Sequence, residues 1–125
     1  MSAIHADRRE PAAPEGPLDL AAAGADLLGE AKSMASGRAA RTLTPGLHAP
    51  LSQTLVAVRA GVELSEHDMN GPATILLLRG RVTMNASAQP IELGAGQWVD
   101  AATRHSLRAD EDAVLLVTVA PTASP

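Results

Sequence analysis

The chain has 125 residues, of which 46% are hydrophobic, so it has the length of one domain and enough apolar side chains for a core. It contains no cysteine, which excludes disulfides and thiolate metal sites, and no Phe or Tyr on which a nucleic-acid base could stack. The net charge of −4, with scattered basic residues, argues against a nucleic-acid partner, and we find neither a membrane span nor a signal peptide.

The first part of the chain divides into an arm and a helix. Residues 1–17 are rich in Ala, Pro and charge and show no apolar period, so we expect a flexible arm. From Leu18 to about Met34, apolar residues recur at helical spacing. Asp19 is placed to cap the start of this short helix, and Gly37 lies beyond its end.

After Gly37 the pattern becomes that of short strands separated by Gly or Pro. The predicted strands are Arg38–Thr44, Leu51–Ala60, Ala73–Leu78, Arg81–Met84, Ile91–Leu93, Gln97–Ala101, His105–Ala109 and Ala113–Ala120. Such a series is typical of an all-β sandwich or barrel. We therefore predict one β-barrel domain with its N-terminal helix over residues 18–120, followed by a loose tail at 121–125.

Two histidines stand out because little else in the chain looks chemical. His67 and His105 each follow a glycine turn, and the segment around His67 has a regular spacing. Gly61 is followed after five residues by His67, then Asp68 and Met69, then after three residues by Ala73, and after six more by Gly80. Further on, Gly96 is followed by five residues, Ala102, two residues and His105, with Ala109 four residues later.

This spacing resembles the two sequence motifs of the cupin superfamily, in particular of small single-domain, RmlC-like cupins. The resemblance covers roughly residues 51–120. It implies an all-β fold, the double-stranded β-helix or jelly-roll barrel, here with a short N-terminal helix. The residues match only in part, since Met69 and Ala73 stand where the motif has its second histidine and its glutamate, and the second loop is shortened.

The resemblance also indicates where a metal would bind. In metal cupins, three histidines and one glutamate hold iron, manganese, nickel or zinc. Only His67 and His105 remain at matching positions, whereas a catalytic metal normally has three protein ligands. His48 is the best candidate for a third imidazole, and Glu66 or Asp68 would have to be turned inward by the loop to contribute.

The match at the glutamate position also predicts which side chains of its strand face the interior. If Ala73 points inward as that position implies, alternation puts Ile75 and Leu77 inside as well. The expected pocket is apolar, with the two histidines at its mouth, and its lining comprises His67, His105, Met69, Ala73, Ile75 and Leu77. Leu76 and Leu78 would face outward and need a cover, either the helix or a second subunit.

We therefore expect a small-molecule-binding cupin without established catalysis, cytoplasmic and homodimeric, with neither a nucleic-acid nor a membrane partner. The alternative is a metal-dependent cupin enzyme, an oxygenase or isomerase, that uses His67 and His105 with an iron, manganese, nickel or zinc ion. A third interpretation is a dimeric protein without any ligand. The identity of the ligand does not follow from the sequence.

Overall fold

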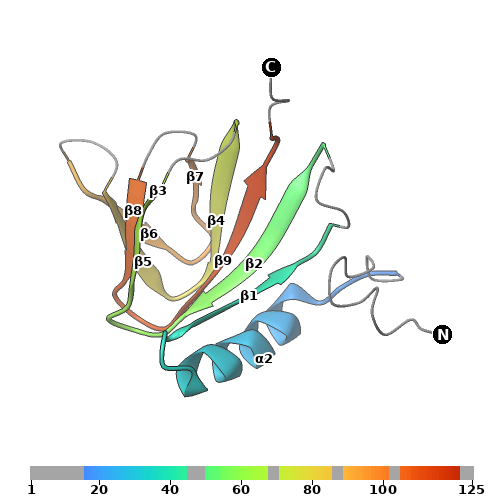
Figure 1. The fold of residues 1–125 in the computed structure, drawn as a ribbon, viewed down its shortest axis with the longest axis horizontal. Helices are drawn as coiled ribbons and strands as arrows, with labels where there is room; N and C mark the ends of the chain where they lie inside the picture. The colour runs from blue at the N-terminus through green and yellow to red at the C-terminus, as the bar shows by residue number, and fades with distance from the viewer. Residues whose placement is uncertain (1–15, 45–49, 68–70, 86–88, 102–104, 122–125) are drawn as a thin grey trace.

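The computed structural model describes residues 16–44, 50–67, 71–85, 89–101 and 105–121, without the side chains of Glu66 and His67. One helix and nine strands are present in this part of the chain, and the strands form two antiparallel sheets that face one another (Figure 1). The elements are α2 (Leu20–Ser33), β1 (Arg38–Thr42), β2 (Ser52–Val58), β3 (Glu63–His67), β4 (Ala73–Arg79), β5 (Arg81–Asn85), β6 (Ile91–Gly94), β7 (Trp98–Asp100), β8 (His105–Ala109) and β9 (Ala113–Val119).

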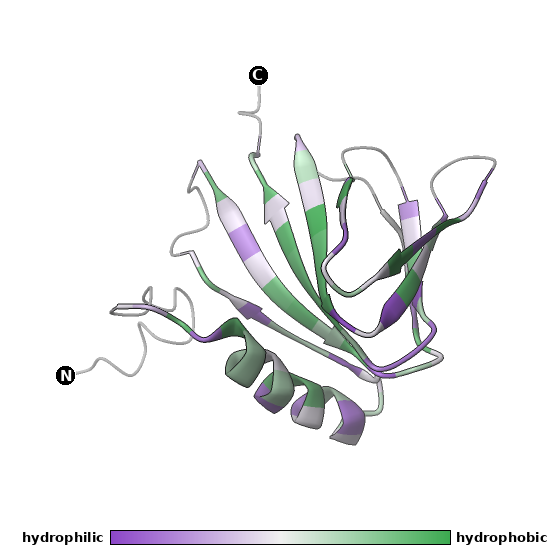
Figure 2. Cartoon of the chain, turned by 180° about the vertical axis from the view of Figure 1, so that it is seen from behind, coloured by the Kyte–Doolittle hydropathy of each residue, from purple (hydrophilic) through white to green (hydrophobic). Residues whose placement is uncertain are grey.

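The larger sheet has the strand order β1-β2-β9-β4-β7, and the smaller one has the order β3-β8-β5-β6. Strands distant in sequence are therefore neighbours, because β9 lies between β2 and β4 and β8 lies between β3 and β5. This is the predicted jelly-roll arrangement. The core lies between the sheets, whose strands contain many hydrophobic residues (Figure 2). Buried side chains alternate along a strand, as in β4, where Ala73, Ile75 and Leu77 are buried.

The helix covers the outer face of the larger sheet. The Asp19 carboxylate accepts hydrogen bonds from the backbone N–H groups of Ala21 and Ala22, at 3.0 and 3.1 Å, so the predicted cap is confirmed. Leu27, Leu28 and Ala31 are buried against Leu55, Ala57 and Val114 of the sheet in a second hydrophobic cluster. The outward residue Leu78 packs against the same cluster, so for Leu78 the cover is the helix, one of the two alternatives.

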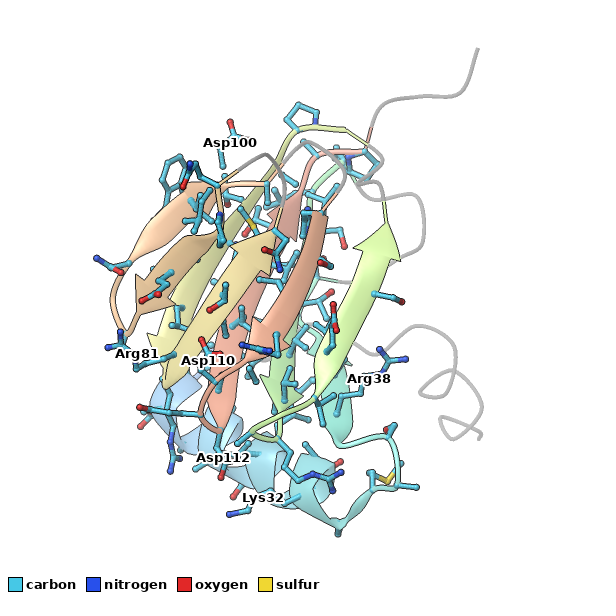
Figure 3. All side chains as sticks on the ribbon, turned by 90° about the vertical axis from the view of Figure 1, so that its left-hand side faces the viewer. Lys32, Arg38, Arg81, Asp100, Asp110 and Asp112 are labelled. Carbon is cyan, nitrogen blue, oxygen red and sulfur yellow. The ribbon has the colours of Figure 1, made fainter. Side chains whose placement is uncertain are left out.

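The end of the sandwich nearest the C-terminal part of α2 is held together by Asp112, in the turn between β8 and β9. Its carboxylate accepts a hydrogen bond from the backbone N–H of Ala60, at 2.9 Å. The same carboxylate lies 3.2 Å from the ammonium group of Lys32 (Figure 3). Asp112 therefore joins the helix, the β2–β3 turn and the β8–β9 turn.

The sequence pattern predicts every element of this part except β3. The segment Glu63–His67 was placed in the first motif without being assigned to a strand, although it pairs with β8 over its length. The bounds of the other strands differ from those predicted by at most two residues. Most of the predicted arm and tail lies outside the described residues, and the helix that is described is too short to cross a membrane.

Candidate functional site

A cavity of about 240 Å³ lies between the two sheets. The larger sheet contributes five lining residues from β2, β4 and β9, and the smaller sheet contributes three from β3 and β8. The lining residues that the structure describes are Thr54, Val56, Leu64, Ile75, His105, Leu107, Leu115 and Val117. Six of these eight side chains are aliphatic, and none is a carboxylate, a lysine or an arginine.

His105 is the only titratable residue among these eight described residues. It is the first residue of β8, it is 1% exposed, and its Nε2 atom is buried. Leu107 lies two residues further along β8 and lines the same cavity, because alternate residues of a strand share a face. The β8 strand thus presents an imidazole and then an aliphatic side chain to the interior.

The polar lining residues lie toward one end of the barrel. Thr54 is near the start of β2, and the start of β2 pairs with the end of β9, where β4 also begins. His105 begins β8, whose other end runs through a short turn into the start of β9. Thr54 and His105 therefore both lie toward the end at which β4 starts, and Val56, Leu107 and Leu115 lie deeper.

A β-bulge brings His67 into register with His105. Leu64 pairs with Leu107, but three residues of β3 then match two of β8, so that His67 pairs with His105. An extra residue in one strand reverses the alternation beyond it. Without the bulge, Glu66 would take the position opposite His105, so the bulge determines that the two histidine backbones lie opposite one another.

The described structure places four of the six residues predicted to line the pocket. Ile75 and His105 line the cavity, whereas Ala73 and Leu77 are buried in the surrounding core without lining it. The predicted alternation of β4 is therefore confirmed, but a contact of these residues with a ligand stays a prediction. Met69 and the side chain of His67 lie outside the described part, as does His48.

Sequence reasoning did not identify most of the cavity lining. Six residues were missed, namely Thr54, Val56, Leu64, Leu107, Leu115 and Val117. The sequence does not show which parity of β2 faces inward, and in the structure Thr54 and Val56 face the cavity. The neighbouring Gln53 instead donates a hydrogen bond to the Thr118 hydroxyl on the other face, at 3.2 Å.

The described side chains do not fit a metal ion. No three His, Asp or Glu side chains in this part of the chain come together as a possible ligand group. Ala73, which stands at the glutamate position of the resemblance, is 4% exposed in the apolar core and supplies no donor atom. One buried imidazole among aliphatic side chains falls short of the three protein ligands of a typical catalytic site.

Comparison with solved structures decides the fold. A cupin superfamily protein from Desulfitobacterium hafniense superimposes with a TM-score of 0.70 and 19% identity, over 91% of this chain and 99% of the other. The chain has the cupin fold. A conserved protein of unknown function from Streptococcus pyogenes gives a TM-score of 0.68 at 19% identity, over 90% and 93% of the two chains. No family model and no curated protein matches the sequence.

An enzyme is also among the structures similar to this cupin fold. Salicylate 1,2-dioxygenase from Pseudaminobacter salicylatoxidans superimposes with a TM-score of 0.65 and 20% identity, over 79% of this chain but only 33% of the enzyme. At such identities the likeness concerns the fold alone. The same barrel therefore occurs in a dioxygenase and in proteins without an assigned reaction, so function has to be argued from the cavity.

Proposed function

We propose that this cupin binds a small organic molecule in the cavity between its sheets, without catalysing a reaction on it. The cavity lined by Thr54, His105 and six aliphatic side chains is the observation that carries the proposal. An apolar pocket with a few polar groups is the usual form of a small-molecule site. Its volume of about 240 Å³ exceeds the roughly 150 Å³ at which an apolar protein cavity takes up benzene.

The lining offers little for catalysis. Covalent catalysis needs a nucleophile with an adjacent base, and within the part of the lining that the structure describes the only hydroxyl belongs to Thr54, on the sheet opposite His105. General acid–base chemistry usually needs a second titratable group, and His105 is the sole one among the described lining residues. Binding makes no such demand, because a neutral imidazole both donates and accepts a hydrogen bond.

A metal-dependent cupin enzyme, an oxygenase or isomerase, is the second candidate. The register that pairs His67 with His105 favours it, and so does the similarity of the barrel to that of a dioxygenase acting on salicylate. Iron, manganese, nickel or zinc would need a third ligand, for which His48, Glu66 and Asp68 are the sequence candidates. We rank this candidate second because the described donors do not fit a metal.

We further propose that the protein is a homodimer that pairs through the outer face of its larger sheet. Leu78 is covered by α2, whereas Leu76 is only half-buried and lies in register with Trp98, which is 61% exposed. Trp98 is the only aromatic residue of the chain. An exposed aromatic side chain beside aliphatic ones is characteristic of an interface. A cytoplasmic location stays a prediction.

Methyl-labelled protein provides a direct test of ligand binding. We expect a panel of neutral, anionic and cationic fragments to contain compounds that shift the methyl resonances of Val56, Ile75 and Leu115 but not those of Leu116 on the other face. Val117→Phe fills the cavity and should abolish these shifts. Leu116→Phe places the same ring on the outer face of the same strand and should leave them unchanged.

Two results would contradict the proposed function. The first is a panel in which no compound of any charge class shifts the cavity methyls. The second is binding that survives Val117→Phe while it is lost in Leu116→Phe, because the ligand would then occupy the outer face.

A further inference from the structure

We infer that the ligand of this cavity is an uncharged, largely apolar molecule of about the size of one substituted ring, with a hydrogen-bonding group at one end. The inference rests on the proposed function and specifies the class of molecule that is bound. It follows from the charge, the polarity and the placement of the lining side chains.

We infer that the ligand is uncharged from the side chains that line the cavity. None of the eight lining residues that the structure describes is an aspartate, glutamate, lysine or arginine, so among them a buried ammonium ion would meet no carboxylate and a buried carboxylate would meet no arginine or lysine. Burial of an ion without a partner carries a desolvation penalty that lowers its affinity by more than about a hundredfold. A carboxylate paired with a protonated His105 is the competing possibility, and the experiment below decides between them.

The position of the polar group follows from the strand register. Thr54 and His105 approach the cavity from opposite sheets, and both lie toward the end at which β4 begins. The deeper lining consists of Val56, Leu64, Leu107 and Leu115. A molecule with its hydrogen-bonding group toward Thr54 and His105 would thus bury its apolar body against aliphatic side chains, where a second polar group would lose its hydrogen bonds.

The size follows from the volume. A cavity of about 240 Å³ admits more than a benzene molecule, which an apolar cavity of about 150 Å³ can hold. No Phe, Tyr or Trp side chain lines it, so aliphatic side chains make most of the contact with the apolar body. Aliphatic and aromatic rings of similar size should therefore bind comparably.

Four ligands of nearly the same shape provide the test: benzyl alcohol, ethylbenzene, benzoate and benzylammonium. We expect benzyl alcohol and ethylbenzene to shift the methyls of Ile75 and Leu115 in the wild-type protein at pH 7.5. Benzoate and benzylammonium should bind more than about a hundredfold more weakly than benzyl alcohol. Val117→Phe should remove binding of both neutral compounds, and Leu116→Phe should not.

Variants then identify the partner of the hydroxyl group. Thr54→Val keeps the shape of the side chain and removes its hydroxyl, and His105→Leu removes the imidazole. At least one of them should lower the affinity for benzyl alcohol up to about tenfold while leaving that for ethylbenzene unchanged. His105→Gln, which keeps a donor and an acceptor, serves as the second variant if His105→Leu does not fold.

The outcomes separate the two proposals. If benzoate or benzylammonium shifts the cavity methyls as strongly as benzyl alcohol, the ligand class is wrong and the binding function stands. The same holds if only other compounds of the panel bind in the cavity. If neither variant changes the ratio of the two neutral affinities, the polar group has no partner there and the inference fails. If no compound binds at all, both proposals fail.

Discussion

His67 pairs with His105 across the β3–β8 ladder, because a β-bulge inserts one extra residue between Leu64 and His67. The pairing places the backbones of the two histidines that match the cupin motifs opposite one another. Two histidines are nevertheless too few ligands for a typical metal site. Two imidazoles leave a metal one ligand short of the usual three. The glutamate position is occupied by the buried Ala73, which has no ligand atom in its side chain.

Metal analysis tests whether the protein lacks enough ligands to bind a metal ion. Protein purified without a chelator and then incubated with iron, manganese, nickel or zinc should contain less than a stoichiometric amount of each, measured by mass spectrometry of the acid-digested protein. The His67→Ala/His105→Ala double variant is the control. A stoichiometric metal in the wild-type protein that is lost in the double variant would favour the enzyme over the binding protein.

Acid should weaken the contacts of Asp112. The hydrogen bond from the Ala60 backbone N–H lowers the pKa of Asp112 below its ordinary value, and the nearby Lys32 and Arg79 side chains act in the same direction. A carboxyl whose pKa is lower in the folded state stabilises the fold above its unfolded pKa of about 3.9, and this contribution is lost as the pH falls through the folded value.

The difference in unfolding free energy between wild type and Asp112→Asn isolates this effect. The wild-type protein should be more stable by about 1 kcal/mol at pH 7, and the difference should shrink as the pH falls below about 4. The measurement is urea unfolding between pH 2.5 and 7. Asp26→Asn, on the exposed side of α2, is the control, and it should show a much smaller change. A difference that grows toward low pH would contradict the prediction.

The turn between β4 and β5 should tolerate no side chain. Gly80 has a φ of 86°, and a Cβ atom added there would overlap the backbone carbonyl oxygen of Asp112. Gly61 has nearly the same φ, 87°, but a Cβ atom there would meet nothing within 4 Å. The two glycines therefore share the backbone strain of a substitution and differ in the steric clash.

Thermal unfolding of Gly80→Ala and Gly61→Ala compares them directly. Gly61→Ala should lower the unfolding free energy by about 1 kcal/mol, from the left-handed conformation alone. Gly80→Ala should lower it by clearly more, on the order of 3 kcal/mol, because the backbone of the β8–β9 turn has to move as well. Equal losses of unfolding free energy in the two variants would contradict the prediction, because the close approach of Gly80 to Asp112 would then not affect stability.

Sedimentation tests the proposed homodimer. At high micromolar concentration the wild-type protein should sediment as a dimer, and Trp98→Glu should shift it toward the monomer, because burial of an unpaired carboxylate opposes association. Glu63→Gln, an exposed position on the smaller sheet, is the control and should leave the dimer intact. A wild-type monomer at this concentration would rule out the dimer.

Much of the fold follows from local pattern. The alternation of β4 predicts which of its side chains are buried, and Asp19 predicts the start of the helix, since both features depend on residues close together in the sequence. The spacing of Gly61, His67 and Gly80 was sufficient to indicate a cupin barrel. The substitutions at Met69 and Ala73 further indicated that the ligand set of metal cupins is incomplete.

Which residues line the cavity depends on the tertiary structure. Thr54 and Val117 line it because β2 and β9 pair although they are distant in the sequence, and no local pattern reveals which parity of β2 faces the smaller sheet. The bulge in β3 likewise arises from pairing with β8, and it sets whether His67 or Glu66 lies opposite His105. Periodicity determines which side chains share a face, whereas only the packing of the two sheets determines what that face encloses.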